Sequence, residues 1–461
     1  MENQPLVTVY ITNYNYGQFI RQSIESVFNQ AYKNIELLII DDGSTDDSRK
    51  IIEEYAGNRN VSIIYQHNKG PNTANNIALR VGRGKYIVRL DADDYFAEKA
   101  LEILVDVLES DPELGLVFPD YYLIDTDSNI IGEVRRFNFC NEVSLLDQPA
   151  HGACTMIRKS YLETLGGYDE SYSCQDGYEL WIKFINQYKV INVNQPLFYY
   201  RQHGNSLSNN ENMILDTRIK IKENFMGKHN IAAPSTFAIL PIRSRNLGGQ
   251  NIPLIELQGV SLLERAVKTA ISSKKLSGLV ITSSENEIES FYLEHIEGKY
   301  PKVMFLKRPE EFARLNESLT KTIRYVLDHQ QVNDQFGIVE TVMTISVEYP
   351  FITSEVLDDA INTLTIFNAD SLLSVRQDNS TYYQHNGNGL KPILGQEKFT
   401  KLEREALYKG VGGIVISKIK GFKENNQMLH GKIGHIVLDA TKAIGIHNDF
   451  ELLISRIICN V

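Results

Sequence analysis

Three aspartates, Asp91, Asp93 and Asp94, stand together where the apolar run 86–90 ends. Carboxylates this close repel one another unless a cation or a proton relieves them. Hard divalent cations such as Mg²⁺ or Mn²⁺ take oxygen ligands and often bridge to phosphates. Aspartate is also common in turns and at helix starts. The run therefore fits a cation site and a helix cap equally well when it is considered alone.

The segments around this run alternate between strand and helix patterns. Short β-rich segments, separated by segments with apolar residues at helical spacing, occupy 6–11, 35–40, 61–65 and 86–90. Such alternation predicts a mostly parallel sheet, in which ligands bind at the carboxyl ends of the strands. Asp41-Asp42 and the aspartate run both fall at such ends. Ser44 or Thr45 is expected to cap the helix that follows.

The same order of segments begins again in the second half of the chain. A β-rich run at 237–241 precedes a helical segment at about 262–271 and a strand at 279–282. The stretch between the halves, 204–234, is polar and rich in Asn. The sequence predicts two α/β domains, at 1–230 and 235–461, each a mostly parallel sheet flanked by helices.

The first 208 residues also carry a set of short motifs in a fixed order. They are Tyr14-Asn15, Val27-Phe28-Asn29-Gln30-Ala31-Tyr32, Asp41-Asp42-Gly43-Ser44-Thr45-Asp46, Asp91-Ala92-Asp93-Asp94, Gly166-Gly167-Tyr168-Asp169, Gln175-Asp176-Gly177-Tyr178-Glu179-Leu180-Trp181 and Tyr199-Tyr200-Arg201-Gln202-His203. With this order and spacing, the segment resembles the family-2 inverting glycosyltransferases of the GT-A fold. The resemblance implies metal-dependent transfer of a sugar from a nucleotide-sugar donor to an acceptor hydroxyl, in the synthesis of a capsule, lipopolysaccharide or glycoprotein.

The resemblance gives four residues roles in binding the donor. Thr12 and Tyr14 match positions that line the nucleotide base, and Asp42 matches the carboxylate that contacts the base or ribose. His203 matches a histidine of the loop that closes over the diphosphate. A purely structural role in a chain crossing is the alternative for His203.

The resemblance also supplies the two groups that the chemistry needs. An inverting transfer requires a base that takes the proton of the acceptor hydroxyl. It also requires a cation that holds the charge building on the leaving diphosphate. Asp176 matches the general base and Asp93 the direct ligand of Mn²⁺ or Mg²⁺, with Asp91 in a ribose or metal role. A solvated loop carboxylate is the alternative for Asp176.

One position departs from the pattern of the family. Many relatives carry Arg where this chain has Asn75, so one contact to the diphosphate lacks its cation. Lys69, Arg80 and Arg89 are the candidates to replace it. Trp181, the only tryptophan, is expected either in the core or against a sugar ring.

A second set of motifs runs from about Phe237 onwards. They are Leu240-Pro241-Ile242-Arg243, Gln250-Asn251-Ile252, Ser261-Leu262-Leu263, Ala369-Asp370-Ser371-Leu372-Leu373-Ser374-Val375, Asn388-Gly389-Leu390-Lys391-Pro392 and Gly431-Lys432-Ile433-Gly434. This segment resembles the sugar-acid cytidylyltransferases, which make CMP-sialic acid and related CMP-sugars. The resemblance implies a nucleotidyltransferase-like Rossmannoid fold.

The functional positions of this second resemblance are altered. Its nucleotide loop includes Arg243, Arg245 and Asn251, but the paired metal-binding aspartates of the family fall at Gly445 and His447. A neutral His is a poor ligand for the hard cation Mg²⁺. We therefore expect a domain that keeps its fold and has lost nucleotidyl transfer. Three roles stay open for this domain: it binds a CMP-sugar, binds a partner, or supports a homodimer.

Two alternatives stay open for the whole chain. One is a bifunctional protein that joins a glycosyltransferase to a CMP-sugar-acid cytidylyltransferase. The other is a non-catalytic scaffold or glycan-binding protein. The partners expected in the leading interpretation are a nucleotide-sugar donor and a glycan or lipid-linked acceptor.

The overall composition limits the remaining partners. The 461 residues carry a formal net charge of −11, which argues against a general nucleic-acid binder. The four cysteines include no C-x-x-C pair, as is typical of reduced cytoplasmic proteins. The first residues do not form a signal peptide, and no apolar run approaches the roughly 20 residues that cross a bilayer. We expect a cytoplasmic protein, with peripheral docking at the inner face of a membrane left open.

Overall fold

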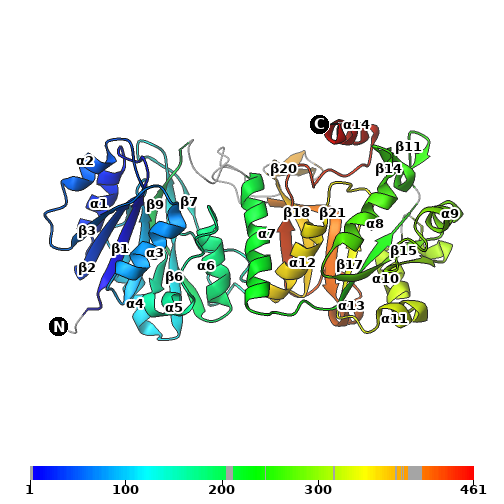
Figure 1. Cartoon of the computed structure of the whole chain (residues 1–461), viewed down its shortest axis with the longest axis horizontal. Coiled ribbons are helices and arrows are strands. Elements are labelled where there is room, and N and C mark those ends of the chain that lie inside the picture. Colours follow the sequence, from blue (N-terminus) through cyan, green and yellow to red (C-terminus); the bar gives the residue numbers. More distant parts are fainter. Residues whose placement is uncertain are drawn as a thin grey trace. The chain divides into compact units, whose positions relative to one another are not determined.

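The computed structural model describes residues 4–203, 211–243, 245–314, 317–378, 380, 382–385, 387, 389–392 and 407–460. The chain divides into two compact units (Figure 1). Unit 1 comprises Met1–Arg218 and Thr381–Glu405, and unit 2 comprises Ile219–Ser380 and Ala406–Val461. Each helix that the structure describes is too short or too polar to serve as a transmembrane span.

Unit 1 contains one large sheet flanked by helices. Its strands are β1 (Val7–Asn13), β2 (Ile35–Asp41), β3 (Val61–Tyr65), β4 (Tyr86–Asp91), β5 (Tyr95–Phe96), β6 (Leu114–Ile124), β7 (Ile130–Val134), β8 (Met156–Arg158) and β9 (Lys189–Arg201). Its helices are α1 (Ile20–Phe28), α2 (Ser48–Glu53), α3 (Pro71–Val81), α4 (Ala100–Ser110), α5 (Lys159–Thr164) and α6 (Asp176–Ile185). Helix α7 (Glu211–Lys228) begins in unit 1 and ends in unit 2.

Strands β1 and β2 read as apolar runs because helices cover both faces of a parallel sheet. Val7, Val9 and Ile11 of β1 are fully buried and share one core with Ile20 and Ile24 of α1. Burial of one such side chain stabilises the fold by about 1.5–3 kcal/mol. The spacing of these residues therefore fixes which face of α1 meets the sheet.

One expected helix cap is wrong. Helix α2 follows Asp47 and has no side-chain cap. The Ser44 hydroxyl instead accepts hydrogen bonds from the backbone N–H of Asn15, at 2.9 Å, and from Asn13 Nδ2, at 2.9 Å. Ser44 thus joins the loops that follow β1 and β2.

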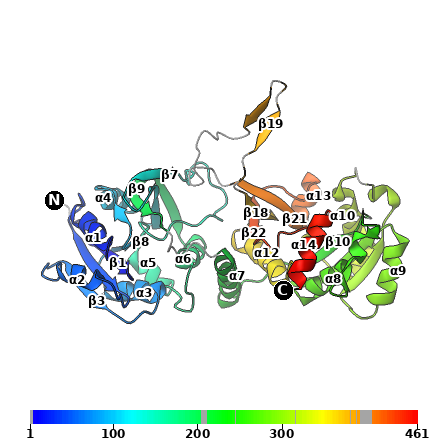
Figure 2. The same ribbon diagram turned by 90° about the horizontal axis from the view of Figure 1, so that it is seen from above.

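Unit 2 has a second sheet, again flanked by helices (Figure 2). Its sheet strands are β10 (Thr236–Pro241), β15 (Leu276–Ser283), β16 (Val303–Lys307), β17 (Thr341–Ile345), β18 (Ser371–Asp378), β21 (Leu407–Lys418) and β22 (Ile433–Val437). Its helices are α8 (Leu262–Ser272), α9 (Asn286–His295), α10 (Leu319–Asp328), α11 (Gln330–Phe336), α12 (Ser354–Ile366), α13 (Ile419–Asn425) and α14 (Asp449–Cys459). Short strand pairs join β11 (Asn246–Leu247) to β12 (Gln250–Asn251), β13 (Glu256–Leu257) to β14 (Val260–Ser261) and β19 (Tyr383–His385) to β20 (Leu390–Pro392).

The two sheets share one strand order. It is β3-β2-β1-β4-β8-β6-β9 in unit 1, where β5 extends the edge and β7 pairs with β6, and β16-β15-β10-β17-β21-β18-β22 in unit 2. In each sheet the first four strands are parallel, and the fifth, β8 or β21, is antiparallel to both neighbours. The expected α/β class, with largely parallel sheets flanked by helices, is confirmed.

Candidate active site

The carboxyl ends of β1, β2 and β4 meet at one edge of the first sheet because these strands are parallel neighbours. Asp42, directly after β2, is buried. Its carboxylate accepts hydrogen bonds from Gln66 Nε2 at 2.6 Å and from the backbone N–H groups of Lys69 and Gly70 at 2.9 Å. Asp42 therefore ties the loop before α3 to the end of β2.

The aspartate run follows β4 at the same edge. Asp91 is the last residue of β4, and Thr12 Oγ1 lies 3.4 Å from its carboxylate. Burial and the neighbouring Asp91 carboxylate raise the pKa of Asp93. Burial together with Asp93 and Asp91 raises the pKa of Asp94 well above its ordinary value. One Asp94 oxygen accepts the backbone N–H of Arg201 at 2.9 Å, and the other is buried without a hydrogen-bond partner among the described residues.

The closely spaced carboxylates of Asp91, Asp93 and Asp94 are suited to bind a divalent cation. Their donors are carboxylate oxygens, which hard cations prefer, and the repulsion that raises the pKa values of Asp93 and Asp94 is what a cation would relieve. Among the described residues, no group of three His, Cys, Asp or Glu side chains is already arranged around one point. The protein carboxylates would thus supply part of the ligand set, and the oxygens of a bound diphosphate could complete it.

His203 is brought to the aspartate run by the long strand β9. Its Nε2 lies 2.8 Å from Asp93 Oδ2, and its ring packs against the rings of Tyr16 and Phe19. Arg201, two residues earlier, is buried and donates from Nε to the backbone oxygen of Asp93 at 2.8 Å. The end of β9 therefore holds the loop that carries the aspartates.

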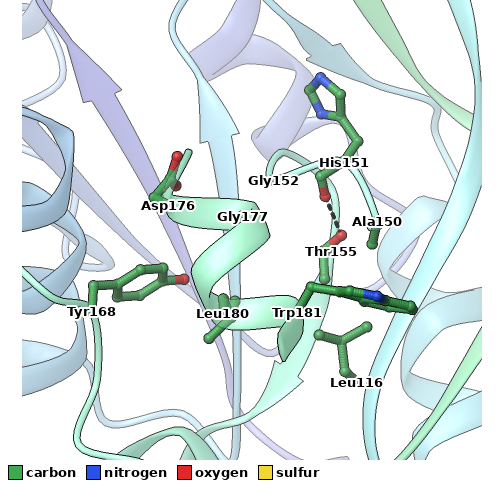
Figure 3. Close-up of a pocket in the computed structure, with 10 residues that line it drawn as sticks. All are labelled: Leu116, Ala150, His151, Gly152, Thr155, Tyr168, Asp176, Gly177, Leu180 and Trp181. Carbon is green, nitrogen blue, oxygen red and sulfur yellow. Dashed lines mark hydrogen bonds between the residues drawn. The ribbon is translucent and has the colours of Figure 1, made fainter. Parts of the chain in front are cut away.

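Asp176 is the first residue of α6 (Figure 3), and two side chains donate to its carboxylate. Arg89 Nη1 donates to its Oδ2, and Asn75 Nδ2 donates to the same oxygen at 3.2 Å. Oδ1 has no donor among the described residues. The Asp176 side chain keeps 16% of its surface exposed, so its carboxylate is within reach of a ligand.

Arg89 joins this carboxylate to the aspartate run. Its Nε lies 3.0 Å from Asp91 Oδ1, while its other end pairs with Asp176. Burial alone lowers the pKa of Arg89, but Asp176 and Asp91 reverse that effect and raise it well above its ordinary value. Gly152 leaves the space for the guanidinium, since a Cβ there would lie 2.4 Å from Arg89 Nη2.

Of the candidates Lys69, Arg80 and Arg89, Arg89 forms ion pairs with Asp91 and Asp176. Arg80 instead lies 3.9 Å from Glu170 with 62% of its side chain exposed. Asn75, where the family pattern would place Arg, is buried and contacts Asp176. Position 89 was one of three alternatives in the sequence. Its ion pair with Asp176 joins residues 87 positions apart, which local spacing does not reveal.

Two aromatic candidates differ in their surroundings. Tyr14 is 45% exposed, so its ring is free to receive a flat ligand. Trp181 is buried, donates to the backbone oxygen of Leu146 at 2.7 Å and packs edge-on against Phe118 and Phe139. Trp181 has the core role.

In unit 2 the corresponding edge carries guanidinium groups. Arg243 follows β10, and Arg308 follows β16 and is buried. Arg308 Nη2 donates to the backbone oxygen of Ile242 at 2.5 Å. Burial and the nearby Arg243 charge lower the pKa of Arg308 to about 10. Neither Nε has a hydrogen-bond partner among the described residues, while the Glu285 carboxylate acts on Arg308 in the direction that raises its pKa.

The other predicted positions of unit 2 are Arg245, Asn251, Gly445 and His447. Arg245 is exposed, and Asn251 Nδ2 donates to Glu287 at 3.0 Å. His447 lies 3.4 Å from the hydroxyl of Tyr349, and Gly445 adjoins the same ring. The positions that would carry metal-binding aspartates therefore hold a Tyr–His contact.

A protein-family model described as glycosyl transferase family 2 matches residues 8–166. Chondroitin synthase of Escherichia coli is 31% identical over 209 residues, which cover 45% of this chain and 30% of that protein. The UDP-Glc:alpha-D-GlcNAc-diphosphoundecaprenol beta-1,3-glucosyltransferase of Escherichia coli is 32% identical over 209 residues, which cover 45% of this chain and 81% of that protein. The chain thus covers less than a third of the first of these relatives and most of the second.

Among solved structures, a mannosyltransferase from Pyrobaculum calidifontis in complex with GDP-Man and Mn²⁺ is 19% identical. The likeness covers 49% of this chain and 65% of that one, with a TM-score of 0.41, which is too low to establish a shared fold. The family model and the sequence relatives decide the assignment, since one relative is matched over four fifths of its length. The chain is therefore a member of glycosyl transferase family 2.

Proposed function

We propose that this protein is a metal-dependent inverting glycosyltransferase of surface glycan synthesis, with Asp176 as its general base. The geometry of Asp176 carries the proposal. Arg89 and Asn75 both hold Oδ2, which leaves Oδ1 without a protein donor and within reach of solvent. A carboxylate fixed by one oxygen and open at the other is suited to accept a proton from an acceptor hydroxyl.

The transfer is a single displacement. The acceptor oxygen forms a bond to the anomeric carbon while the bond from that carbon to the diphosphate breaks, and the hydroxyl proton moves to Asp176 Oδ1. A cation held by Asp93, with Asp91 beside it, would neutralise the charge that builds on the leaving diphosphate. Arg89 contacts both Asp91 and Asp176, so it aligns the donor and acceptor sides of the site.

The donor is a nucleotide-sugar in this proposal. Thr12 and Tyr14 would line the nucleotide base, and Asp42, which holds the loop before α3, would contact the base or ribose. His203, which lies next to Asp93, would contact the diphosphate. The acceptor is a glycan or a lipid-linked glycan, which the protein would meet in the cytoplasm at the inner face of the membrane. The relatives named above act in glycan synthesis, which supports this class of acceptor.

The proposal is tested with the full chain, Mn²⁺ or Mg²⁺, and a panel of UDP-, GDP-, dTDP- and CMP-sugars. We expect Asp93→Ala and Asp176→Asn each to lower transfer by roughly 10²- to 10⁴-fold, because the first removes a ligand of the proposed cation and the second removes the proposed base. Asp106→Asn, an exposed site on α4, is the control. Full activity in Asp176→Asn would rule out the assignment of the base.

For unit 2 we propose metal-independent binding of a nucleotide phosphate, such as that of a CMP-sugar, without nucleotidyl transfer. Arg243 and Arg308 support this role, because two guanidiniums lie close enough to repel each other and both Nε groups lack a hydrogen-bond partner, which favours an anion between them. The bifunctional alternative would need oxygen ligands where Gly445 and His447 stand. Calorimetry with CMP in a chelator tests the proposal, and absence of binding would refute it.

A further inference from the structure

The turn that presents Asp176 has an unusual backbone. Gln175, the residue before Asp176, has a φ of 63° and lies in the left-handed region. This conformation costs a non-glycine residue roughly 1 kcal/mol or more. Its backbone oxygen accepts the N–H groups of Tyr178 and Glu179, both at 3.1 Å, and so begins α6. The direction of Asp176 thus depends on how firmly Gln175 is held.

Helix α7 supplies the group that holds Gln175. Arg218 Nε donates to Gln175 Oε1 at 2.7 Å, and the Arg218 guanidinium lies 4.7 Å from the centre of the Tyr178 ring. One residue earlier, Thr217 Oγ1 accepts the thiol of Cys174 at 3.4 Å. These contacts all go to residues 174–178, on both sides of the base.

Apolar packing does not explain these contacts. The buried residues of α7 are Ile221, Lys222, Phe225 and Met226, all later in the helix than Arg218. The part of α7 that belongs to unit 1 therefore meets the turn at 174–178 through two hydrogen bonds and a cation–π contact, and Arg218 supplies one of these hydrogen bonds and the cation–π contact. A planar guanidinium can make both contacts at once, whereas an ammonium group cannot reproduce that geometry.

From this geometry we propose that Arg218 is a positioning residue for glycosyl transfer. Through Gln175 and Tyr178 it fixes the turn that aims Asp176 Oδ1 at the acceptor hydroxyl. The inference rests on the proposed role of Asp176 as the base. It adds to the catalytic unit a residue that lies 52 positions beyond the end of the family match at residue 166.

The test compares kcat and KM for Arg218→Met, Arg218→Lys and Gln175→Leu in the full chain. A displaced base lowers kcat, so we expect a fall of roughly 10- to 100-fold in Arg218→Met and Gln175→Leu, with the donor KM unchanged. Arg218→Lys should recover only part of the loss. The double variant Arg218→Met/Gln175→Leu should lose no more of kcat than the more impaired single variant, because both substitutions break the same hydrogen bond. Lys220→Met, exposed on the same helix, is the control.

Two results would overturn the inference while leaving the base assignment intact. One is an unchanged kcat in Arg218→Met and Gln175→Leu while Asp176→Asn abolishes transfer. The other is an equal loss in donor affinity and kcat, which indicates general loosening of the unit. If Arg218→Met does not fold, the Gln175→Leu and Arg218→Lys values decide between these outcomes. Full transfer by Asp176→Asn would instead remove the proposed base and the inference together.

Discussion

At the scale of single residues, charge distribution decides what the candidate site can do. Asp91, Asp93 and Asp94 gather negative charge at one end, and Arg89 carries one positive charge between them and Asp176. Without Arg89, Asp176 would be one more carboxylate facing a carboxylate cluster. The ion pairs of Arg89 thus hold Asp91 and Asp176 in one arrangement.

His151, beside this cluster, should make the stability of the protein depend on pH. Its ring lies among the rings of Tyr121, Phe198 and Tyr200, and burial lowers its pKa from 6.5 to about 4. The unfolded chain therefore binds a proton on His151 at a higher pH than the folded chain does. The stability that neutral His151 provides is complete above pH 6.5 and is lost as the pH falls towards 4.

The variant His151→Asn removes this titration while keeping an acceptor for the N–H of Ala153, which now donates to His151 Nδ1 at 3.1 Å. Between pH 7 and pH 4.5, wild type should lose about 2–3 kcal/mol more unfolding free energy than the variant. Urea unfolding at the two pH values measures the difference. Equal losses in both proteins would contradict the expected pKa.

The sequence predicted some of these site residues and not others. Asp93 and His203 were singled out by motifs, and the structure brings them within 2.8 Å across 110 positions. The αL conformation of Gln175 was not foreseeable, because glycine is the residue that normally marks such a position. The contacts of Arg89 and Arg218 depend on tertiary packing that no local pattern encodes.

At the scale of elements, close backbone contacts set where the functional strands lie. The turn before β4 contains Gly84, whose N–H donates to Thr8 Oγ1 at 2.9 Å. A Cβ at this position would lie 2.5 Å from the backbone nitrogen of Thr8 and 2.6 Å from the backbone oxygen of Tyr86. Glycine therefore lets β4, which carries Arg89 and Asp91, lie close to β1.

We expect Gly84→Ala to destabilise the protein by about 2 kcal/mol or more, because the backbone atoms that the new methyl group meets cannot rotate away. Gly57→Ala is the matched control, since a Cβ at Gly57 would meet nothing within 4 Å. Chemical unfolding of both variants provides the measurement. A similar stability for the two would show that β1 and β4 can separate without cost.

Elements with one clear period were the ones that sequence predicted best. The segments 6–11, 35–40, 61–65 and 86–90 all became strands, within one or two residues at each end. The long strands β6 and β9 were not predicted. Their polar and aromatic residues, such as Asn194 and Tyr199, suit the partly exposed far half of the sheet rather than a buried run.

At the scale of the whole molecule, each unit has one edge where strand ends could bind a ligand, and the two edges differ in charge. Carboxylates line the edge in unit 1, and guanidiniums lie at the edge in unit 2. Binding of a nucleotide phosphate should therefore require a divalent cation at the first edge and not at the second.

Calorimetry on the full chain can separate the two edges. With CMP in a chelator, Arg308→Met should lose binding, while Asp93→Ala and the control Arg456→Met on α14 should retain it. Truncating Arg308 removes a buried donor and should weaken binding by roughly 10-fold or more. Equal binding in Arg308→Met and wild type would exclude the arginine pair as the phosphate site.

The shared strand order gives this chain an internal control. Strand β4 in unit 1 and strand β17 in unit 2 hold the same place in their sheets. Strand β4 ends at Asp91 and is followed by Ala92-Asp93, whereas strand β17 is followed by Ser346-Val347-Glu348. The chain therefore has two equivalent sheet edges, one with paired aspartates and one without. The contribution of the aspartate side chains to ligand binding can be compared between these edges in a single sample.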